Sequence, residues 1–277
     1  MIKAAFGQPP EHFNGELRWF VRHQGRLLLT DEARPSLPQL PLRVARMVFA
    51  GEPQYLGQLH SGEHCMAVDL ADQPEPPTGF VAEELRRLIG LLDETDFLMA
   101  SRALQLLVWQ RNHRFCGRCG APTERLGHEL AMLCPSCGLG QYPRVTPCII
   151  TLVHREDRVL LGHNARFPQG LYSCLAGFVE AGEDAEHALA REVWEESGLR
   201  VDQLRYHGSQ SWPFPHSLML AYHARHHSGE IRVDGEEIVD AQWFDRQQLP
   251  SLPPSGSIAR SLIDSWLDGT FSYSGFA

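Results

Sequence analysis

The segment that decides the fold is Gly177-Phe178-Val179-Glu180-Ala181-Gly182-Glu183-Asp184-Ala185-Glu186-His187-Ala188-Leu189-Ala190-Arg191-Glu192-Val193-Trp194-Glu195-Glu196-Ser197-Gly198-Leu199. It predicts a glycine-containing loop and then a helix over 184–197, which ends at Gly198, a typical C-terminal residue. The helix carries Glu192, Glu195 and Glu196 close together. Such carboxylates repel one another, whereas hard cations such as Mg²⁺ bind carboxylate and phosphate oxygens together. The segment therefore predicts a metal-dependent enzyme acting on a phosphate ester or anhydride.

The order of residues on this helix supports that interpretation. Glu192 and Glu196 are four residues apart, so they lie on one face and can share a cation. Arg191 precedes Glu195 by one turn and can hold it through an ion pair. The helix also has an apolar side for docking, formed by Ala185, Ala188, Leu189 and Val193.

The composition of the chain limits the number of domains and the classes of partner that it can have. The chain has 277 residues, 43% of them hydrophobic and 21% charged, which is typical of a globular protein with two modest domains. Its apolar runs are shorter than a membrane helix, and the N-terminus lacks the apolar core of a signal peptide. The net charge of −9 and the absence of a basic run argue against binding long nucleic acid by electrostatics alone.

Four of the seven cysteines form two Cys-x-x-Cys pairs, Cys116/Cys119 and Cys134/Cys137. Each pair makes a tight turn, relieved in the first by Gly117 and Gly120, and two such turns complete a tetrahedral Zn²⁺ site. Four thiolates leave no open coordination position, so this zinc is predicted to be structural. The arginines around the pairs either contact phosphates or form a solvated face.

Three further cysteines, Cys65, Cys148 and Cys174, are unpaired. An odd number of cysteines without a secretion signal indicates metal ligation in a reducing cytoplasm and not disulfides. Cys148 and Cys174 lie in apolar stretches, so we interpret them as buried fillers and not as catalytic thiols.

The first part of the chain is predicted to be a small mixed domain without a motif of its own. Proline-broken segments suggest short strands over 17–21, 26–29, 47–49 and 66–70, followed by a loop or hinge over 72–79. A helix is expected over 81–92, and a second from Thr95 or Asp96 to Trp109, with Ala100, Ala103, Leu104, Leu107 and Val108 on one packing face.

Beyond the cysteines the pattern changes. Strands are predicted over 148–153, 158–162 and 218–225, a further one ends at Trp243-Phe244, and a final helix covers 257–267. The expected domains are therefore an N-terminal mixed α/β domain (1–94), a connecting helix (95–113), a zinc ribbon (114–142) and a catalytic domain (143–277).

The quoted segment resembles the Nudix box, G-x5-E-x7-R-E-U-x-E-E-x-G-U with U a bulky aliphatic residue, and matches it at every fixed position from Gly177 to Leu199. The resemblance covers roughly residues 145–260. It implies an α+β fold, an α/β/α sandwich with a mixed sheet, which hydrolyses nucleoside diphosphates linked to another group with Mg²⁺ or Mn²⁺. It also implies that Arg191 orients a glutamate and does not touch substrate.

Two further motifs resemble the NADH pyrophosphatase and NAD-capped RNA hydrolase subfamily. The stretch Ser209-Gln210-Ser211-Trp212-Pro213-Phe214-Pro215-His216-Ser217 matches the subfamily signature except for Ser211, where the family has proline. Tyr142-Pro143-Arg144 matches a second stretch, and the four-cysteine ribbon precedes the box as in that subfamily. Without the resemblance, Trp212 and Phe214 are as well explained by core packing as by ring stacking.

The resemblance implies a set of site residues. Metal ions would be held by Ala176 through its carbonyl, Glu192, Glu196 and Glu237, although Glu236 is a competing alignment for the last. Glu195 or Glu196 would accept the proton of the attacking water, so the catalytic set is Glu192, Glu195 and Glu196. The expected substrate contacts are Tyr142, Gln210, Ser211, Trp212, Pro213, Phe214, Pro215, His216, Ser217, Ala259 and, more weakly, Arg87.

The implied reaction is hydrolysis of the pyrophosphate of NADH or NAD⁺ to nicotinamide mononucleotide and AMP. The same bond joins NAD to capped RNA, so removal of the NAD cap from RNA 5′ ends is a second expectation. The resemblance also implies a cytoplasmic homodimer.

Three alternatives stay open on sequence alone. The first is a Nudix pyrophosphatase of other specificity, for ADP-ribose or dinucleoside polyphosphates. The second is a non-enzymatic zinc-ribbon and Nudix ligand sensor, although such proteins usually lose box glutamates. The third is an RNA decapping enzyme for which free NADH is incidental.

Overall fold

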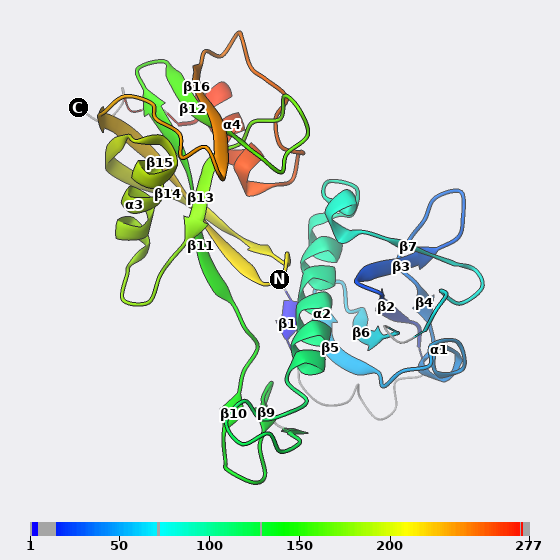
Figure 1. The fold of residues 1–277 in the computed structure, drawn as a ribbon. Coiled ribbons are helices and arrows are strands. Elements are labelled where there is room, and N and C mark those ends of the chain that lie inside the picture. Colours follow the sequence, from blue (N-terminus) through cyan, green and yellow to red (C-terminus); the bar gives the residue numbers. More distant parts are fainter. Residues whose placement is uncertain (1, 5–14, 71–72, 128, 272, 274–277) are drawn as a thin grey trace. The chain divides into compact units, whose positions relative to one another are not determined.

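The computed structural model describes residues 2–4, 15–70, 73–127, 129–271 and 273. The chain divides into two compact units, Met1–Arg144 and Val145–Ala277, which are coloured along the sequence in Figure 1. Among the helices in the described ranges, none is long and apolar enough to cross a membrane.

The second unit is built on a mixed sheet. Its strands are β11 (Thr146–Arg155), β12 (Arg158–Asn164), β13 (Leu175–Phe178), β14 (Arg200–Trp212), β15 (Ser217–Ser228) and β16 (Ile238–Phe244). The order is β14-β15-β11-β12-β16, and β13 pairs with β11. The β11–β15 pair is parallel and the others are antiparallel, which confirms the predicted mixed sheet.

Alternating side chains of β11 supply the cores on the two faces of this sheet. Ile150 and Leu152 pack in one core with α4 (Ile258–Leu267). Ile149 and Val153 pack in the other with α3 (Ala185–Ser197). The two helices therefore cover opposite faces, as Figure 1 shows, and the predicted α/β/α sandwich is confirmed.

The carboxylate helix α3 forms as its sequence predicts. The Asp184 carboxylate caps its N-terminus by accepting from the His187 N–H at 2.9 Å. Gly198 ends it in the left-handed conformation, at φ 72°, which a residue with a side chain adopts only with strain. Leu189 and Val193 are fully buried on its apolar side. The caps therefore fix where α3 begins and ends, and the core contacts fix which of its sides packs on the sheet.

The first unit also contains a mixed sheet. Its strands are β1 (Ile2–Ala4), β2 (Leu17–His23), β3 (Arg26–Thr30), β4 (Gln39–Leu40), β5 (Gln54–Leu59), β6 (His64–Asp69) and β7 (Phe80–Glu83), in the order β1-β5-β6-β2-β3-β7 with β4 on β2. One pair, β2–β6, is parallel. Helices α1 (Leu42–Val48) and α2 (Glu94–Asn112) accompany the sheet, and α2 packs against β2, β5 and β6.

Several local predictions for this unit are wrong. Of the strand expected over 47–49, Met47 and Val48 end helix α1 and Phe49 is its C-cap; Ala45 and Phe49 face the core. The helix expected over 81–92 is strand β7 followed by a short 3₁₀ helix, η1 (Leu85–Leu88). Pairing of β7 with β3 supplies the backbone hydrogen bonds there, so tertiary contacts override helix propensity.

Other boundaries differ less. The N-cap of helix α2 is Asp93, two or three residues before the expected caps, and its carboxylate accepts from the Asp96 N–H at 2.8 Å. Of the expected packing face, Ala100, Ala103, Leu104 and Leu107 are buried, whereas Val108 is only partly buried. The loop expected over 72–79 has no helix or strand in its described part, 73–79, while Asp72 lies outside the described residues.

Candidate active site

Arg191 holds the glutamates of α3 in place. Its guanidinium donates to Glu183 at 2.7 and 2.8 Å, to Glu192 at 2.8 Å and to Glu195 at 2.9 Å. It also donates to the carbonyl of Phe178 at 2.9 Å, so one side chain joins the helix to the loop before it. The Arg191 hydrogen bonds lower the pKa of Glu183 to about 2. The predicted Arg191–Glu195 ion pair is confirmed.

The carboxylate of Glu192 lies directly against Gly177. A Cβ added at Gly177 would sit 1.8 Å from the Glu192 Cδ and 2.1 Å from its Oε1, far inside van der Waals contact. Only a residue without a side chain therefore leaves room for Glu192 at this position. The role of Gly177 is therefore to leave space for this carboxylate.

Glu196 is the most buried of the three helix carboxylates. Only 5% of the residue is exposed, and its Oε2 has no hydrogen-bond partner among the described residues. Burial, together with the charges of Glu192, Glu237 and Asp234, raises the pKa of Glu196 to about 8. Burial likewise raises the pKa of Glu192, although Arg191 opposes that shift. A cation among these groups would supply the partner that the buried oxygen lacks.

Glu237 reaches this cluster from the loop before β16. Its charge raises the pKa of both Glu192 and Glu196, and its carboxylate accepts from the Asn164 amide at 3.3 Å. The Asp234 carboxylate shapes the loop by accepting from three successive backbone N–H groups, those of Glu236, Glu237 and Ile238, at 2.8 to 3.0 Å. The geometry therefore favours Glu237 of the two candidates.

Ala176 lies on β13 opposite Ile150 of β11. A backbone hydrogen bond from Ala176 to the Glu196 carboxylate moderates the raised pKa of that group. In an antiparallel pair the N–H and C=O of one residue point to the same edge. The Ala176 carbonyl therefore also faces the side on which Glu196 lies.

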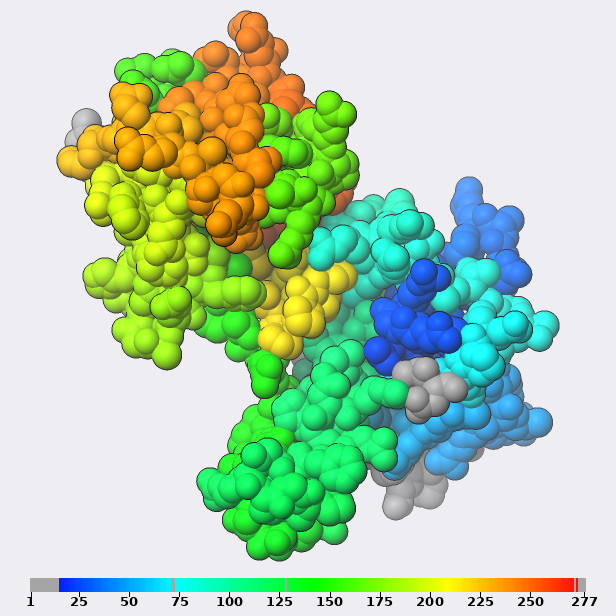
Figure 2. Space-filling view, in the orientation of Figure 1, coloured from blue at the N-terminus to red at the C-terminus, as the bar shows by residue number. Residues whose placement is uncertain are grey.

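The dinucleotide-binding segment expected from sequence forms the end of β14 and the turn into β15. In Figure 2 this part of the second unit, coloured yellow, lies at the surface. The rings of Trp212 and Phe214 meet edge to face with centroids 5.1 Å apart. Trp212 also packs on the core beneath α4, so the packing interpretation holds for one side of its ring.

Gln210 has a structural role in this segment. Its amide donates to the Gly256 carbonyl at 2.8 Å and accepts from the Ile258 N–H at 2.9 Å. Both ends of the amide thus fix the start of α4, which carries Ala259, itself 7% exposed. These bonds leave Gln210 less able to read a base edge than its sequence position suggests.

The other residues of the segment differ in exposure. His216 bonds Thr146 of β11 through Nδ1 at 3.0 Å, and Ser217 is buried. Of the remaining positions, Pro213 is buried, Ser211 and Phe214 are partly buried, and Pro215 is exposed. The segment thus offers the Phe214 and Pro215 side chains to a ligand more readily than those of Pro213 and Ser217.

Two expected contacts belong to the first unit. Tyr142 is 61% exposed and its hydroxyl donates to Glu129 at 3.4 Å. Arg87 lies on η1 with its guanidinium 3.7 Å from Glu83, and 71% of its side chain is exposed. Both side chains are therefore accessible on their own unit.

Three residues of the site escaped the sequence reasoning. Phe178, 53% exposed, follows Gly177 directly on β13 and offers an open ring at the surface. The amide of Asn164, at the end of β12, donates to the Glu237 carboxylate at 3.3 Å. Asp234 shapes the loop that carries Glu237. An exposed aromatic residue inside the box was a usable signal for Phe178, whereas the Asn164 contact spans 73 residues of sequence.

The buried thiols take no part in this chemistry. Burial raises the pKa of Cys148 to about 12, and the charges of Glu192, Glu196 and Glu237 add to the shift. Burial also raises the pKa of Cys174. Both thiols stay protonated at neutral pH, which excludes them as nucleophiles and supports their interpretation as core fillers.

The four paired cysteines converge in the first unit. Their sulfur atoms lie within 4.8 Å of one another, and among the described residues they are the one group of possible ligand atoms that is so close. The two turns are equivalent, since the Gly120 N–H donates to the Cys116 carbonyl and the Gly138 N–H to the Cys134 carbonyl, each at 2.9 Å. Gly120 and Gly138 are the left-handed residues of these turns, so Gly138 and not Gly117 is the second glycine required.

The sulfur cluster suits a zinc ion. Backbone N–H groups of Cys119 and Arg118 lower the pKa of Cys116 to about 6, which favours the thiolate that zinc binds. Around the cluster lies a three-stranded sheet of β8 (Glu124–Arg125), β9 (Met132–Leu133) and β10 (Gly140–Gln141). These features are those of a zinc ribbon with a closed, structural site.

Three family models together match most of the chain. A NUDIX domain matches residues 143–266, an NADH pyrophosphatase zinc ribbon domain matches 111–142, and an NADH pyrophosphatase-like rudimentary NUDIX domain matches 16–109. The last assigns a family to the part of the chain in which the sequence revealed no motif.

Curated relatives cover nearly the full length. The chain is 44% identical to the NAD-capped RNA hydrolase NudC of Pseudomonas aeruginosa (strain LESB58) over 258 residues, which is 90% of this chain and 88% of that protein. It is 42% identical to the protein of that name from Stutzerimonas stutzeri (strain A1501), over 90% of this chain and 89% of the other. For the Salmonella paratyphi C (strain RKS4594) protein the identity is 41%, over 89% and 91%.

The contact between Gly177 and Glu192 predicts that Gly177→Ala displaces the Glu192 carboxylate. We expect kcat/KM for the enzyme's substrate to fall at least about tenfold, or about 1.4 kcal/mol of transition-state free energy, with little change in unfolding temperature. Gly208→Ala is the matched control, because a Cβ there has nothing within 4 Å. Equal activity of the two variants would show that Glu192 can move without cost.

Burial of Glu196 predicts a pH-dependent stability when divalent cations other than the ribbon zinc are absent. The pKa of Glu196 is about 8 in the folded protein against an ordinary 4.5, so between these values the folded state binds the extra proton. The free energy of unfolding should then fall as pH rises from 6 to 8, by up to about 1.4 kcal/mol per pH unit. Urea denaturation at several pH values measures this slope.

The matched variants for that experiment are Glu196→Gln and Glu186→Gln, the second in the exposed first turn of α3. The first should lose most of the slope and the second should keep it. An unchanged slope in Glu196→Gln would assign the pH dependence to other groups.

Proposed function

The chain belongs to the Nudix hydrolase family, in its NADH pyrophosphatase and NAD-capped RNA hydrolase group, and on that premise we propose that it hydrolyses the pyrophosphate bond of NADH or NAD⁺. The products are nicotinamide mononucleotide and AMP. The same bond links NAD to the 5′ end of capped RNA, so removal of that cap is part of the proposal. It is supported by relatives whose name is NAD-capped RNA hydrolase.

The observation that carries the proposal is the buried, unpartnered Oε2 of Glu196, whose pKa is raised by burial and by the charges of Glu192, Glu237 and Asp234. Oxygen donors of this kind fit Mg²⁺ or Mn²⁺ and would hold them together with the Ala176 carbonyl. When bound, such ions neutralise the charge that develops on a pyrophosphate and activate water.

The side chains of the protein have separate roles in this scheme. Arg191 keeps Glu192 and Glu195 in fixed rotamers through its hydrogen bonds, and contacts no substrate. Glu196 or Glu195 accepts the proton of the attacking water. The thiols Cys148 and Cys174 form no covalent intermediate, because both stay protonated.

Recognition of the substrate falls to aromatic and polar groups around the carboxylates. Phe178 and the Trp212–Phe214 pair offer ring faces for the flat ends of a dinucleotide. The β14–β15 turn as a whole, Gln210 to Ser217, and Ala259 of α4 would line the same side. Tyr142 and Arg87 are proposed contacts from the first unit, and in a homodimer they can come from either copy.

We also propose that the enzyme is a homodimer that works in the cytoplasm. All seven cysteines are free thiols in the structure, and four of them form the zinc ribbon, which suits a reducing compartment. Sedimentation velocity at several concentrations measures the oligomeric state.

The proposed activity is tested by the products of NADH hydrolysis with and without Mg²⁺ or Mn²⁺. Nicotinamide mononucleotide and AMP should form only when a divalent ion is added. ADP-ribose and dinucleoside polyphosphates serve as competing substrates, and NAD-capped RNA as the alternative one. Turnover of ADP-ribose but not of NADH would contradict the proposed specificity, and no turnover of any of them would favour the ligand-sensor alternative.

The choice of Glu237 over Glu236 makes a separate prediction. Glu237→Gln should raise the Mg²⁺ concentration needed for half-maximal NADH hydrolysis by about tenfold or more, because it removes a charged ligand. Glu236→Gln, the adjacent exposed residue, is the matched control and should leave that concentration unchanged. The reverse order of effects would transfer the metal-binding role to Glu236.

A further inference from the structure

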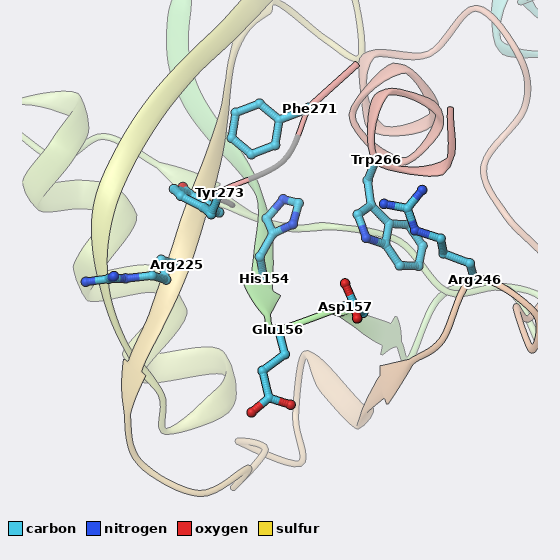
Figure 3. Close-up of a pocket in the computed structure, with 8 residues that line it drawn as sticks. All are labelled: His154, Glu156, Asp157, Arg225, Arg246, Trp266, Phe271 and Tyr273. Carbon is cyan, nitrogen blue, oxygen red and sulfur yellow. The ribbon is translucent and has the colours of Figure 1, made fainter. Parts of the chain in front are cut away.

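The second unit contains a cavity that the proposed reaction does not use. Its volume is about 260 Å³, and its wall includes His154 near the end of β11 (Figure 3). Ile150, which pairs with Ala176 beside the carboxylates, lies four residues earlier on the same strand. At the rise of an extended strand this is about 13 Å away, and none of Glu192, Glu195 and Glu196 lines the cavity.

His154 of the cavity wall is held from behind by His223 and, through it, by Ser265. His154 Nε2 lies 2.8 Å from His223 Nδ1, and His223 Nε2 lies 3.2 Å from the Ser265 hydroxyl. The ring of Phe271 stacks on His223 with centroids 3.6 Å apart. Burial, together with the charge of the nearby Arg246, lowers the pKa of His154 to about 4, so this histidine is neutral at pH 7.

Aromatic rings form one side of the cavity. Phe271 and Tyr273 meet edge to face, with centroids 5.1 Å apart, and Tyr273 also meets His154 edge to face. Figure 3 shows both rings on one side of His154, with Trp266 on the other. Phe271 and Tyr273 are only partly buried, so they retain accessible surface for a flat ligand.

Arg246 supplies an available cationic group. Its guanidinium lies over the buried Trp266 ring at 5.1 Å and donates to the Leu267 carbonyl at 2.9 Å. In the described part of the chain no carboxylate forms an ion pair with it, whereas Arg225 on the same wall is bound to Asp202 by two bonds of 2.8 Å. A guanidinium fixed on an indole, with N–H groups to spare, is well suited to bind a phosphate.

The acidic side chains of Glu156 and Asp157 complete the wall. They occupy the turn between β11 and β12, and Figure 3 shows Asp157 between His154 and Arg246. Neither forms an ion pair with any described residue. Carboxylates with free lone pairs accept hydrogen bonds from the hydroxyls of a ribose, as in dinucleotide-binding folds.

We propose that this cavity is a second nucleotide site, which binds a nucleoside monophosphate with its phosphate on Arg246, its ribose hydroxyls on Asp157 and Glu156, and its base against Phe271 and Tyr273. The volume lies below the roughly 300–1,000 Å³ of sites for larger ligands, so a mononucleotide fits better than a dinucleotide. The assignment rests on the cavity alone, although the proposed reaction would supply such a ligand as its product.

The experiment measures binding of AMP to the full chain by calorimetry, with the ribbon zinc in place and no other divalent ion added. Arg246→Ala should weaken binding at this site at least about tenfold. Arg155→Ala is the matched control, because Arg155 lies over Trp243 at 5.7 Å in the same way but does not line the cavity. The control should bind AMP like the unaltered protein, and equal affinities of the two variants would overturn the proposal.

A second variant tests the ribose contact and does not depend on the first. Asp157→Asn, in an exposed turn, should weaken binding of AMP severalfold but leave that of 2′,3′-dideoxyadenosine monophosphate unchanged. Equal weakening of both ligands would overturn the assigned contact, and inorganic phosphate that binds as tightly as AMP would reduce the site to an anion site. Because none of these readouts uses NADH turnover, the second site and the proposed reaction can fail separately.

Discussion

Electrostatic repulsion among carboxylates is the constraint on which the second unit depends. Burial raises the pKa of Glu192 and Glu196, and the charges of neighbouring carboxylates, Glu237 among them, add to both shifts; Glu196 is almost fully buried. Arg191 offsets part of this charge, but it bonds Glu192 and Glu195 and leaves Glu196 without a cationic partner. A divalent ion is the simplest group that would balance the remainder.

The contacts around these carboxylates hold them close together despite their repulsion. The caps at Asp184 and Gly198 fix the length of α3, and its apolar side fixes its rotation on the sheet. Gly177 removes the one side chain that would displace Glu192. The loop shaped by Asp234 positions Glu237, which lies about 40 residues after the helix glutamates in the sequence. Gln210 bonds the segment proposed to bind substrate to the start of α4. Stability and the site thus rest on the same contacts.

Sequence reasoning succeeded where local signals agree. Helix α3 has a cap, an apolar face and a terminal glycine, so its limits and its carboxylate face were predictable, and the paired cysteines were equally informative. Sequence reasoning failed where the secondary structure depends on contacts with residues distant in the sequence. Strand β7 is a strand because β3 pairs with it, and α1 forms because Ala45 and Phe49 have a common core to face. Asn164 and Asp234 could not be found in advance, since their role depends on contacts across the sheet and on loop geometry.

The central claim is that the acidic cluster binds the divalent ions required for cleavage of a diphosphate. Crystals soaked with Mn²⁺ and a non-hydrolysable NAD analogue test it most directly, through the anomalous scattering of manganese. The account predicts anomalous peaks within bonding distance of Glu192, Glu196 and Glu237, with the pyrophosphate oxygens of the analogue as further ligands. Manganese bound elsewhere, with these three side chains turned away from the analogue, would contradict it.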